Sequence, residues 1–265
     1  MSTQPAICFE DVTFSYGSEA VLSRVDFDVF ATEYVSVVGP NGGGKTTLLK
    51  LALGLLKPDS GRIRIFGEPA AKARGALGYV PQHMQFDPVF PARALDVVCM
   101  GDVGRRSFGF ASRADRERAE AALDQVGLGD QAQAQFSELS GGQRQAVLIA
   151  RALVGEPQAI LLDEPDAHID PGRRSDLKLL LDRLPKEITR ILVSHNMDFV
   201  LSSVEKVICV HRDVHVHPTS ELTPERLQSI FGGDLRLIRH DREHPSACAH
   251  QHPKPGATDA GGQHE

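Results

Sequence analysis

The chain has no cluster of basic residues, and its overall charge is acidic. Its 265 residues include 29 Lys and Arg against 35 Asp and Glu, which gives a formal net charge of −6. A nucleic-acid-binding surface is normally basic, because it has to neutralise phosphates. The composition therefore argues against nucleic-acid binding as the main function. The length suffices for about two domain-sized units, or for one large α/β domain with an inserted lobe.

Long apolar runs and paired cysteines are missing as well. The longest apolar runs, such as 51–56 and 147–150, fall far short of the roughly 20 residues that a membrane-spanning helix needs. The amino end shows no charged-then-apolar leader, so we expect no secretory signal. The cysteines form no C-x-x-C pair, and we expect reduced thiols in the cytoplasm rather than a disulfide framework. They are Cys8, Cys99, Cys209 and Cys248.

Glycine, by contrast, is concentrated in residues 39–47, which read GPNGGGKTT. The spacing fits G-x-x-x-x-G-K-[ST], in which successive backbone N–H groups surround a phosphate chain. We expect Lys45 to reach the β- and γ-phosphates, the Thr46 hydroxyl to ligate Mg²⁺, and the helix that starts here to direct its positive end at the anion. The predicted nucleotide-binding residues of this loop are Gly39, Pro40, Asn41, Gly42, Gly43, Gly44, Lys45, Thr46 and Thr47.

Apolar patterning around this loop predicts an α/β fold. Residues 12–16 and 25–29 alternate apolar with polar side chains, as two half-buried antiparallel strands would. Residues 34–38 are mostly apolar and end at the phosphate loop, which indicates a central parallel strand buried on both faces. Residues 63–65 and 78–81 predict two further strands. We therefore expect a sheet-based core that presents the phosphate loop at a strand end.

The middle of the chain has a helical pattern. Residues 86–137 lack strand alternation, and the charged helix expected at 113–126 turns Ala119, Ala122, Leu123 and Val126 inward. A phosphate-loop core does not need this segment, so about 86–145 is predicted to be an inserted helical subdomain. Its aromatic residues are candidates either for a partner surface or for packing inside the lobe. They are Phe90, Phe108 and Phe110.

Residues 139–143 read LSGGQ and open another predicted helix. Ser140 is placed as its N-cap, and the two glycines leave the first N–H groups open to an anion. One chain then has two phosphate-binding helix starts about a hundred residues apart, more than one nucleotide pocket needs. This favours a symmetric head-to-tail homodimer, in which one copy closes over the nucleotide held by the other. The closing residues are Ser140, Gly141, Gly142 and Gln143.

Two acidic residues follow a buried apolar strand at 159–162. Asp163 and Glu164 lie at its carboxyl end, where ligand sites of open α/β sheets are found. We expect Asp163 to hold the Mg²⁺ shell and Glu164 to polarise the water that attacks the γ-phosphate. The alternative is that both acids simply cap the next helix, and the order of the motifs disfavours it. That helix is predicted to start with Asp170 as N-cap and Pro171 in its first turn.

The phosphate loop, LSGGQ and the Asp163–Glu164 pair together resemble the ATP-binding subunits of ABC transporters, over about residues 7–233. The resemblance implies a P-loop NTPase of the ABC ATPase fold, with a RecA-like core, an antiparallel β subdomain and an inserted α-helical subdomain. The ATP-binding domain would span 1–235, with ATP and Mg²⁺ as cofactors.

The resemblance also implies roles for single residues. Gln82 would contact Mg²⁺ and relay the nucleotide state, His195 would contact the γ-phosphate, and Tyr16 would stack on adenine. Asp170 would lie in the loop that crosses the dimer interface. Departures from the family pattern concern the fine structure of that interface. They are Asp166 and His168, where the family more often has small or uncharged residues, and Gln145 in place of a common arginine.

Histidines gather near the carboxyl end. After Ile238 the chain has no Val, Leu, Ile, Met, Phe, Tyr or Trp, so residues 236–265 are expected to be disordered. This tail is either a Zn²⁺-binding segment or a solvating one. Upstream, His215 and His217 would share one face of an extended strand. The candidate zinc ligands of the tail are His240, His244, Cys248, His250 and His252.

Three segments, 39–67, 78–91 and 215–223, resemble the zinc and manganese uptake branch of ABC importers. This likeness implies integral membrane permease subunits, an extracytoplasmic metal-binding protein, and a peripheral location at the cytoplasmic face of the inner membrane. The expected function is ATP hydrolysis that energises import of a divalent metal, zinc first and manganese or iron as alternatives.

Two other classes of function stay open. A soluble ABC ATPase acting on DNA or ribosomes generally has coiled-coil insertions or tandem cassettes, and neither is seen between Gln82 and Leu139. A metal-binding regulatory protein with a secondary ATPase would bind metal without contacting a permease.

Overall fold

The computed structural model describes residues 4–82, 91–101 and 111–219, except 168, 171, 173, 197–199 and 201–203. The chain divides into two units, Met1–Leu235 and Arg236–Glu265, and the second lies wholly outside the described residues. The candidate zinc ligands of the tail and the aromatic residues Phe90, Phe108 and Phe110 therefore lie outside the described residues as well. Within the described part, no helix has the length and apolar character of a membrane span.

The larger sheet has six strands in the order β10-β9-β3-β8-β7-β6. All neighbours in it are parallel except the antiparallel pair β9 and β10. Every residue of β3, β7 and β8 is buried, as expected for apolar strands covered on both faces. The strands are β3 (Tyr34–Val38), β6 (Leu77–Val80), β7 (Ala159–Asp163), β8 (Thr189–Val193), β9 (Lys206–His211) and β10 (Asp213–Pro218).

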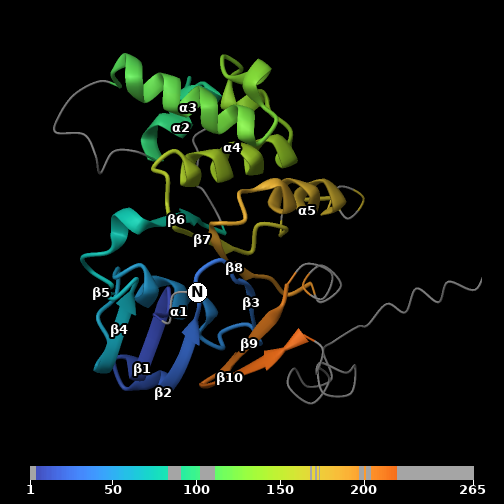
Figure 1. The fold of residues 1–265 in the computed structure, drawn as a ribbon. Coiled ribbons are helices and arrows are strands. Elements are labelled where there is room, and N and C mark those ends of the chain that lie inside the picture. The colour runs from blue at the N-terminus through green and yellow to red at the C-terminus, as the bar shows by residue number, and fades with distance from the viewer. Residues whose placement is uncertain are drawn as a thin grey trace, which may run out of the picture. The chain divides into compact units, whose positions relative to one another are not determined.

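The smaller sheet is antiparallel and has the order β2-β1-β4-β5. Its apolar residues alternate with polar ones, and the inward ones pack against helix α1 and one face of the larger sheet (Figure 1). Phe9 and Phe27 stack at the centre of this core with ring centroids 4.6 Å apart. The elements are β1 (Ile7–Tyr16), β2 (Glu19–Val29), β4 (Ser60–Ile65), β5 (Glu68–Pro69) and α1 (Lys45–Ala52).

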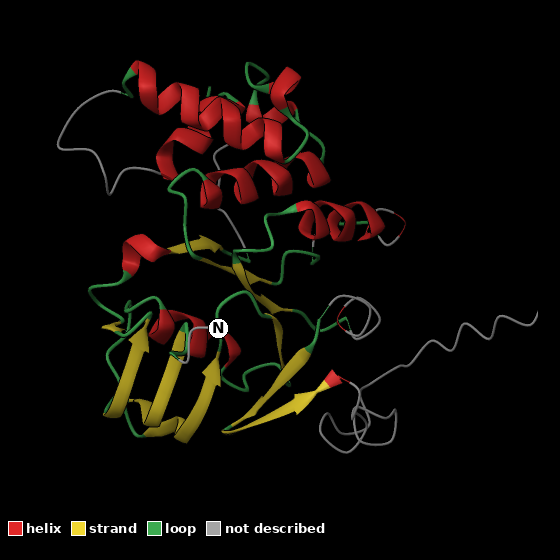
Figure 2. Cartoon of the chain, viewed as in Figure 1, coloured by secondary structure: helices red, strands yellow, loops and turns green. Residues whose placement is uncertain are grey.

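Helices cover the other face of the larger sheet. A second core joins α2, α3, α4 and α5 to the opposite side chains of the same strands, so that Leu161 packs in one core while its neighbour Leu162 packs in the other. Figure 2 shows α2, α3 and α4 gathered in one helical group beyond the sheets. The bounds are α2 (Ala94–Cys99), α3 (Arg113–Gln125), α4 (Gly141–Leu153) and α5 (Arg174–Arg183).

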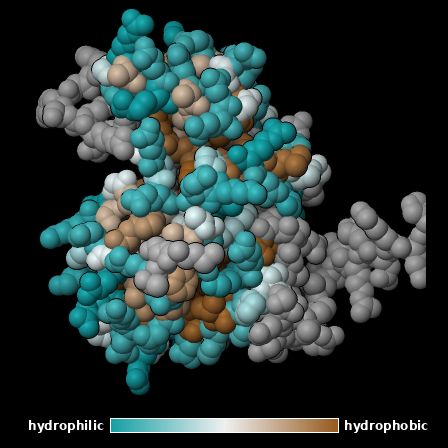
Figure 3. Space-filling view, viewed as in Figure 1, coloured by the Kyte–Doolittle hydropathy of each residue, from teal (hydrophilic) through white to brown (hydrophobic). Residues whose placement is uncertain are grey.

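The sequence predicted most of these elements, and the start of one helix is displaced. Helix α5 is described from Arg174, four residues after Asp170, which the sequence predicts as its N-cap. Gly172 between them already lies in a 3-10 turn, and Ile169 N donates to Asp166 O at 3.3 Å just before it. Met100, at the C-cap of α2, is 46% exposed. The surface seen in Figure 3 is largely hydrophilic, with apolar side chains emerging in a few places.

Candidate functional site

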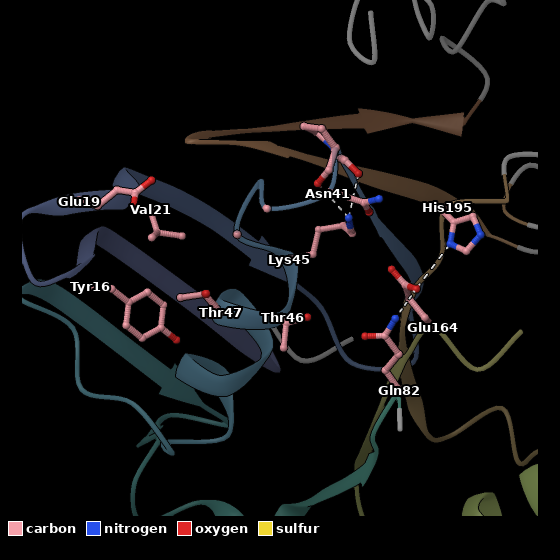
Figure 4. Close-up of a pocket in the computed structure, with 14 residues that line it drawn as sticks. Tyr16, Glu19, Val21, Asn41, Lys45, Thr46, Thr47, Gln82, Glu164 and His195 are labelled. Atoms are coloured by element: carbon pink, nitrogen blue, oxygen red, sulfur yellow. Dashed lines mark hydrogen bonds and ion pairs between the residues drawn. The ribbon is translucent and has the colours of Figure 1, made fainter. Parts of the chain in front are cut away.

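Four neighbouring strands end at the same edge of the larger sheet and carry the predicted site residues. β3, β8, β7 and β6 are adjacent in this order, and all four are parallel. Their carboxyl ends lead to the phosphate loop, to His195, to Asp163 and Glu164, and to Gln82, respectively. Residues that are far apart in the sequence therefore meet in one row, as ligand sites of open α/β sheets do (Figure 4).

The phosphate loop depends on its glycines. Gly44 is the N-cap of α1 and has a left-handed φ of 103°. A Cβ on Gly39 would lie 2.1 Å from the carbonyl oxygen of Val210, so the loop packs directly on the backbone of β9. A side chain at Gly39 would displace that strand or the loop. The backbone amides are thus held at the start of a helix, where an anion is favoured.

Lys45 is nearly buried within this loop. Its Nζ donates to Gly39 O at 2.9 Å and to Pro40 O at 3.0 Å. Burial lowers the pKa of the Lys45 ammonium group, and the negative charges of Glu164 and Asp163 oppose that change. The loop therefore contains a cationic group held by two backbone carbonyls, and Figure 4 shows it on the side of the cavity where Glu164 lies.

Asp163, at the end of β7, is only 2% exposed. Burial, and then the charge of Glu164, raises the pKa of its carboxyl group; the Thr46 hydroxyl, Tyr79 and Lys45 oppose the rise. Tyr79 donates to Oδ2 at 3.4 Å, whereas Oδ1 is buried and has no hydrogen-bond partner in the described part of the chain. A carboxylate oxygen without a partner next to a threonine hydroxyl fits the hard oxygen ligands that Mg²⁺ prefers.

Glu164 joins two other strand ends. Its side chain is 12% exposed, Gln82 Nε2 donates to its Oε2 at 2.7 Å, and His195 Nδ1 lies 3.5 Å from the same oxygen. The backbone of Glu164 has a left-handed φ of 47°, which a hydrogen bond of 2.9 Å from its N–H to Val193 O helps to hold. Figure 4 shows the three side chains pointing toward one another. The arrangement can hold and polarise a water beside a bound phosphate.

A cavity of about 950 Å³ opens over the loop and these side chains. Its volume lies at the upper end of small-molecule sites. Tyr16, 51% exposed and edge-on to Phe14 at 4.9 Å, lies at the opposite end from Glu164. The residues that line the cavity are Tyr16, Glu19, Val21, Gly39, Pro40, Asn41, Gly42, Gly44, Lys45, Thr46, Thr47, Gln82, Glu164 and His195.

Sequence reasoning missed Glu19, Val21 and Tyr79. The first two line the cavity from β2, and Tyr79 reaches Asp163 from β6. Alternation marked β2 and β6 only as strands, and no local signal distinguishes these three residues. Of the predicted residues, Gly43 and Asp163 lie in the loop and on β7 without lining the cavity.

The LSGGQ helix stands apart from this cavity within one chain. Ser140 caps α4: its Oγ accepts from Gln143 N at 3.3 Å, and Gln143 Oε1 accepts from Ser140 N at 2.9 Å. Ser140, Gly142 and Gln143 line a different, mostly apolar cavity of about 190 Å³, and neither Gly141 nor Asp170 lines the larger one. The structure therefore brings together the strand-end residues but not the predicted closing residues.

The histidines of β9 and β10 lie at the far edge of the larger sheet. β10 is extended, which is the condition under which His215 and His217 share one face, and their ring centroids are 6.4 Å apart. No group of three or more His, Cys, Asp or Glu suited to a metal occurs among the described residues.

Comparison with known proteins agrees with this site. Residues 22–167 match the ABC transporter family. The manganese transport system ATP-binding protein MntB of Bacillus subtilis is 38% identical over 236 residues, which are 87% of this chain and 94% of that protein. The zinc transport system ATP-binding protein TroB of Treponema pallidum is 36% identical over 240 residues, 88% of this chain and 90% of that protein.

A solved structure shares the fold. It is a dimeric ATP-binding cassette in a post-hydrolysis state, bound to ADP and Pi. It superposes with a TM-score of 0.69 at 27% sequence identity and covers 80% of this chain and 98% of that chain.

The fold, the phosphate loop and the helix that begins with LSGGQ define an ATP-hydrolysing cassette of the P-loop class. The chain belongs to the ABC transporter family and is an ATPase of that family coupled to transport. The α/β fold class expected from the sequence is confirmed.

Proposed function

We propose that the chain is the ATP-binding and ATP-hydrolysing subunit of an importer of divalent metal ions, with zinc as its cargo. Its relatives include a manganese system and a zinc system, which supports a metal but leaves its identity between the two. The histidines at 215–217 and 240–252 favour zinc over manganese and iron, because imidazole is a good ligand for zinc.

The phosphate loop and Tyr16 bind the nucleotide in this proposal. Tyr16 stacks on adenine, while residues 39–47 hold the phosphates through backbone amides and Lys45. Thr46, Asp163 and Gln82 would hold Mg²⁺, and the ion would supply neutralisation of the phosphate charge. The buried Oδ1 of Asp163, which has no hydrogen-bond partner among the residues that the structure describes, supports this assignment.

Glu164 is the proposed general base. Its carboxylate, held by Gln82 at 2.7 Å, polarises the water that attacks the γ-phosphate. His195, 3.5 Å from the same carboxylate oxygen, contacts the γ-phosphate and orients that water. The single observation that carries the proposal is this convergence of Gln82, Glu164 and His195 beside Lys45.

The full site needs two copies of the chain. Ser140, Gly141, Gly142, Gln143 and Asp170 do not line the nucleotide cavity of their own chain, which supports their action across a head-to-tail homodimer. The dimeric cassette described above supports the same assembly.

We place the subunit peripherally at the cytoplasmic face of the inner membrane, bound to integral permease subunits that cooperate with an extracytoplasmic metal-binding protein. The ATP-binding domain is residues 1–235, with about 86–145 as its helical subdomain, and 236–265 form a separate histidine-rich segment that binds zinc. Uptake assays with zinc, manganese and iron in turn test the cargo.

The decisive experiment replaces Glu164 with Gln. This change keeps the size and one hydrogen-bond acceptor but removes the base, so we expect hydrolysis to fall by roughly a hundredfold or more while ATP still binds. The ATP-loaded variant is expected to accumulate as a closed dimer, measured by size-exclusion chromatography with ATP and Mg²⁺. Glu187→Gln, on an exposed surface, is the matched control and keeps parental hydrolysis. Parental hydrolysis by Glu164→Gln would remove Glu164 from this role.

A further inference from the structure

A buried pair outside the proposed catalytic groups connects two of the functional loops. Asp166 and Ser194 are both 0% exposed. Ser194 Oγ lies 3.1 Å from Asp166 Oδ1 and 3.2 Å from Oδ2, so its hydroxyl donates to the carboxyl group. A carboxyl group at this depth is stabilised only through such hydrogen bonds.

Each member of the pair is placed next to a proposed catalytic residue. Asp166 follows Glu164 by two residues, in a turn where Ala167 N donates to Glu164 O at 3.1 Å. Ser194 precedes His195 directly, and its Oγ also accepts from Asn196 N at 3.1 Å. The serine hydroxyl therefore fixes the peptide on both sides of His195 and links it to the loop of Glu164.

His195 needs an external support of this kind. Its side chain is 55% exposed, so packing does little to hold the imidazole 3.5 Å from Glu164 Oε2. A side chain with that much exposure loses rotamer freedom when it is held in one orientation. The fold can instead fix the backbone on either side of His195, and the hydrogen bonds of Ser194 to Asp166 and Asn196 do so.

We propose that Asp166 is a positioning residue, which acts through Ser194 to set His195 relative to Glu164. The inference rests on the proposed ATP hydrolysis at Glu164 and adds a residue to its machinery. This role also explains why an acidic side chain is present at position 166, where the family more often has a small or uncharged one.

The first test compares Asp166→Ala and Ser194→Ala with the parent, as full-length chains. Each is expected to lower kcat roughly tenfold or more while KM for ATP stays within about twofold, because a displaced His195 affects the chemical step and not the phosphate loop. Ser36→Ala is the matched control. It removes an equally buried hydroxyl, which donates to Leu192 O at 2.9 Å, and is expected to keep the parental kcat.

The second test asks whether Asp166 acts through His195. In a His195→Ala background, Asp166→Ala is expected to change the single-turnover rate by less than about twofold. A merely structural role would lower the rate by the same factor in both backgrounds, and that result would overturn the proposal. Asp166→Asn keeps an acceptor for Ser194 and is expected to restore most of the kcat lost in Asp166→Ala.

If Asp166→Ala does not fold, the same comparisons are made with Ser194→Ala and Ser194→Cys. If the folded Asp166 or Ser194 variants keep the parental kcat, the positioning role is contradicted but the proposed ATP hydrolysis is not. Absence of Mg²⁺-dependent ATP hydrolysis in the parent contradicts the proposed function itself, and the inference with it, so the two failures are distinguishable.

Discussion

At the residue scale, the site holds charges that the fold alone disfavours. Asp163 is nearly fully buried, and burial followed by the charge of Glu164 raises the pKa of its carboxyl group. Burial lowers the pKa of Lys45 in the same region. Both shifts oppose the ionised forms that Mg²⁺ and phosphate binding require. Burial of Asp163 and Lys45 therefore reduces the stability of the ligand-free chain.

Replacing Asp163 with Asn is expected to stabilise the ligand-free chain. A carboxyl group whose pKa is raised on folding contributes stability at low pH, and this contribution is lost as the pH rises through the folded pKa. Below pH 3.8, the ordinary pKa of an aspartate carboxyl group, the variant should therefore melt at about the parental temperature. At pH 8 it should melt roughly 2–4 °C higher than the parent.

Thermal unfolding followed by circular dichroism across this pH range measures the effect, and addition of ATP and Mg²⁺ should stabilise the parent more than the variant. The exposed Asp59→Asn serves as control and should leave the melting temperature within about 1 °C. A lower melting temperature of Asp163→Asn at pH 8 would contradict the argument.

At the scale of elements, local sequence patterns predicted the strand bounds and helix caps that depend on neighbouring residues. The apolar run 34–38 ends at the phosphate loop, and β3 has these bounds. The hydroxyl of Ser140 and the two glycines after it predict the N-cap of α4, and Ser140 caps that helix. Helix α5 is described from Arg174, four residues after the Asp-Pro pair that predicts its start, and Gly172 between them lies in a 3-10 turn, after Ile169 is buried.

Contacts between elements could not be predicted in this way. The hydrogen bond from Gln82 to Glu164 spans 82 residues, and that from Ser194 to Asp166 spans 28. Both depend on the order of strands in the sheet, which places β7 between β6 and β8. Strand order is a property of the whole packed sheet and leaves no signal in the spacing of single residues.

One glycine sets how closely β6 approaches α4. A Cβ on Gly78 would lie 2.4 Å from the carbonyl oxygen of Ala152, so Gly78→Ala is expected to destabilise the chain by about 1–3 kcal/mol. Urea unfolding measures the change. Gly75→Ala, where a Cβ meets nothing within 4 Å, is the matched control and should stay within about 0.5 kcal/mol of the parent. Equal stabilities of the two variants would refute the close approach.

At the scale of the whole molecule, the two groups of residues proposed to enclose ATP lie in separate cavities of one chain. The nucleotide cavity lies over the phosphate loop, while Ser140, Gly142 and Gln143 line another cavity. If Ser140, Gly142 and Gln143 bind the nucleotide of a partner copy, then added atoms at this surface should not clash with their own chain. A Cβ on Gly142 would indeed meet nothing within 4 Å.

Gly142→Asp therefore separates folding from assembly. The acid lies in the first turn of α4, where negative charge is tolerated, so the unfolding free energy should stay within about 0.5 kcal/mol of the parent. ATP-dependent dimerisation and hydrolysis should be lost, as measured by light scattering and phosphate release. Mixing this variant with Lys45→Ala should restore one intact composite site and a heterodimer. Parental dimerisation of Gly142→Asp alone would contradict the head-to-tail assembly.

Because β3, β8, β7 and β6 are adjacent, their main chains set the spacing of the proposed catalytic residues at the strand ends. Hydrogen-bonded strands lie about 4.8 Å apart, so three steps span roughly 14 Å from the phosphate loop to Gln82. That pitch comes from peptide groups and is the same whichever apolar side chains fill the two cores. Apolar core residues can thus be substituted during evolution while the distances between the residues at the strand ends stay constant.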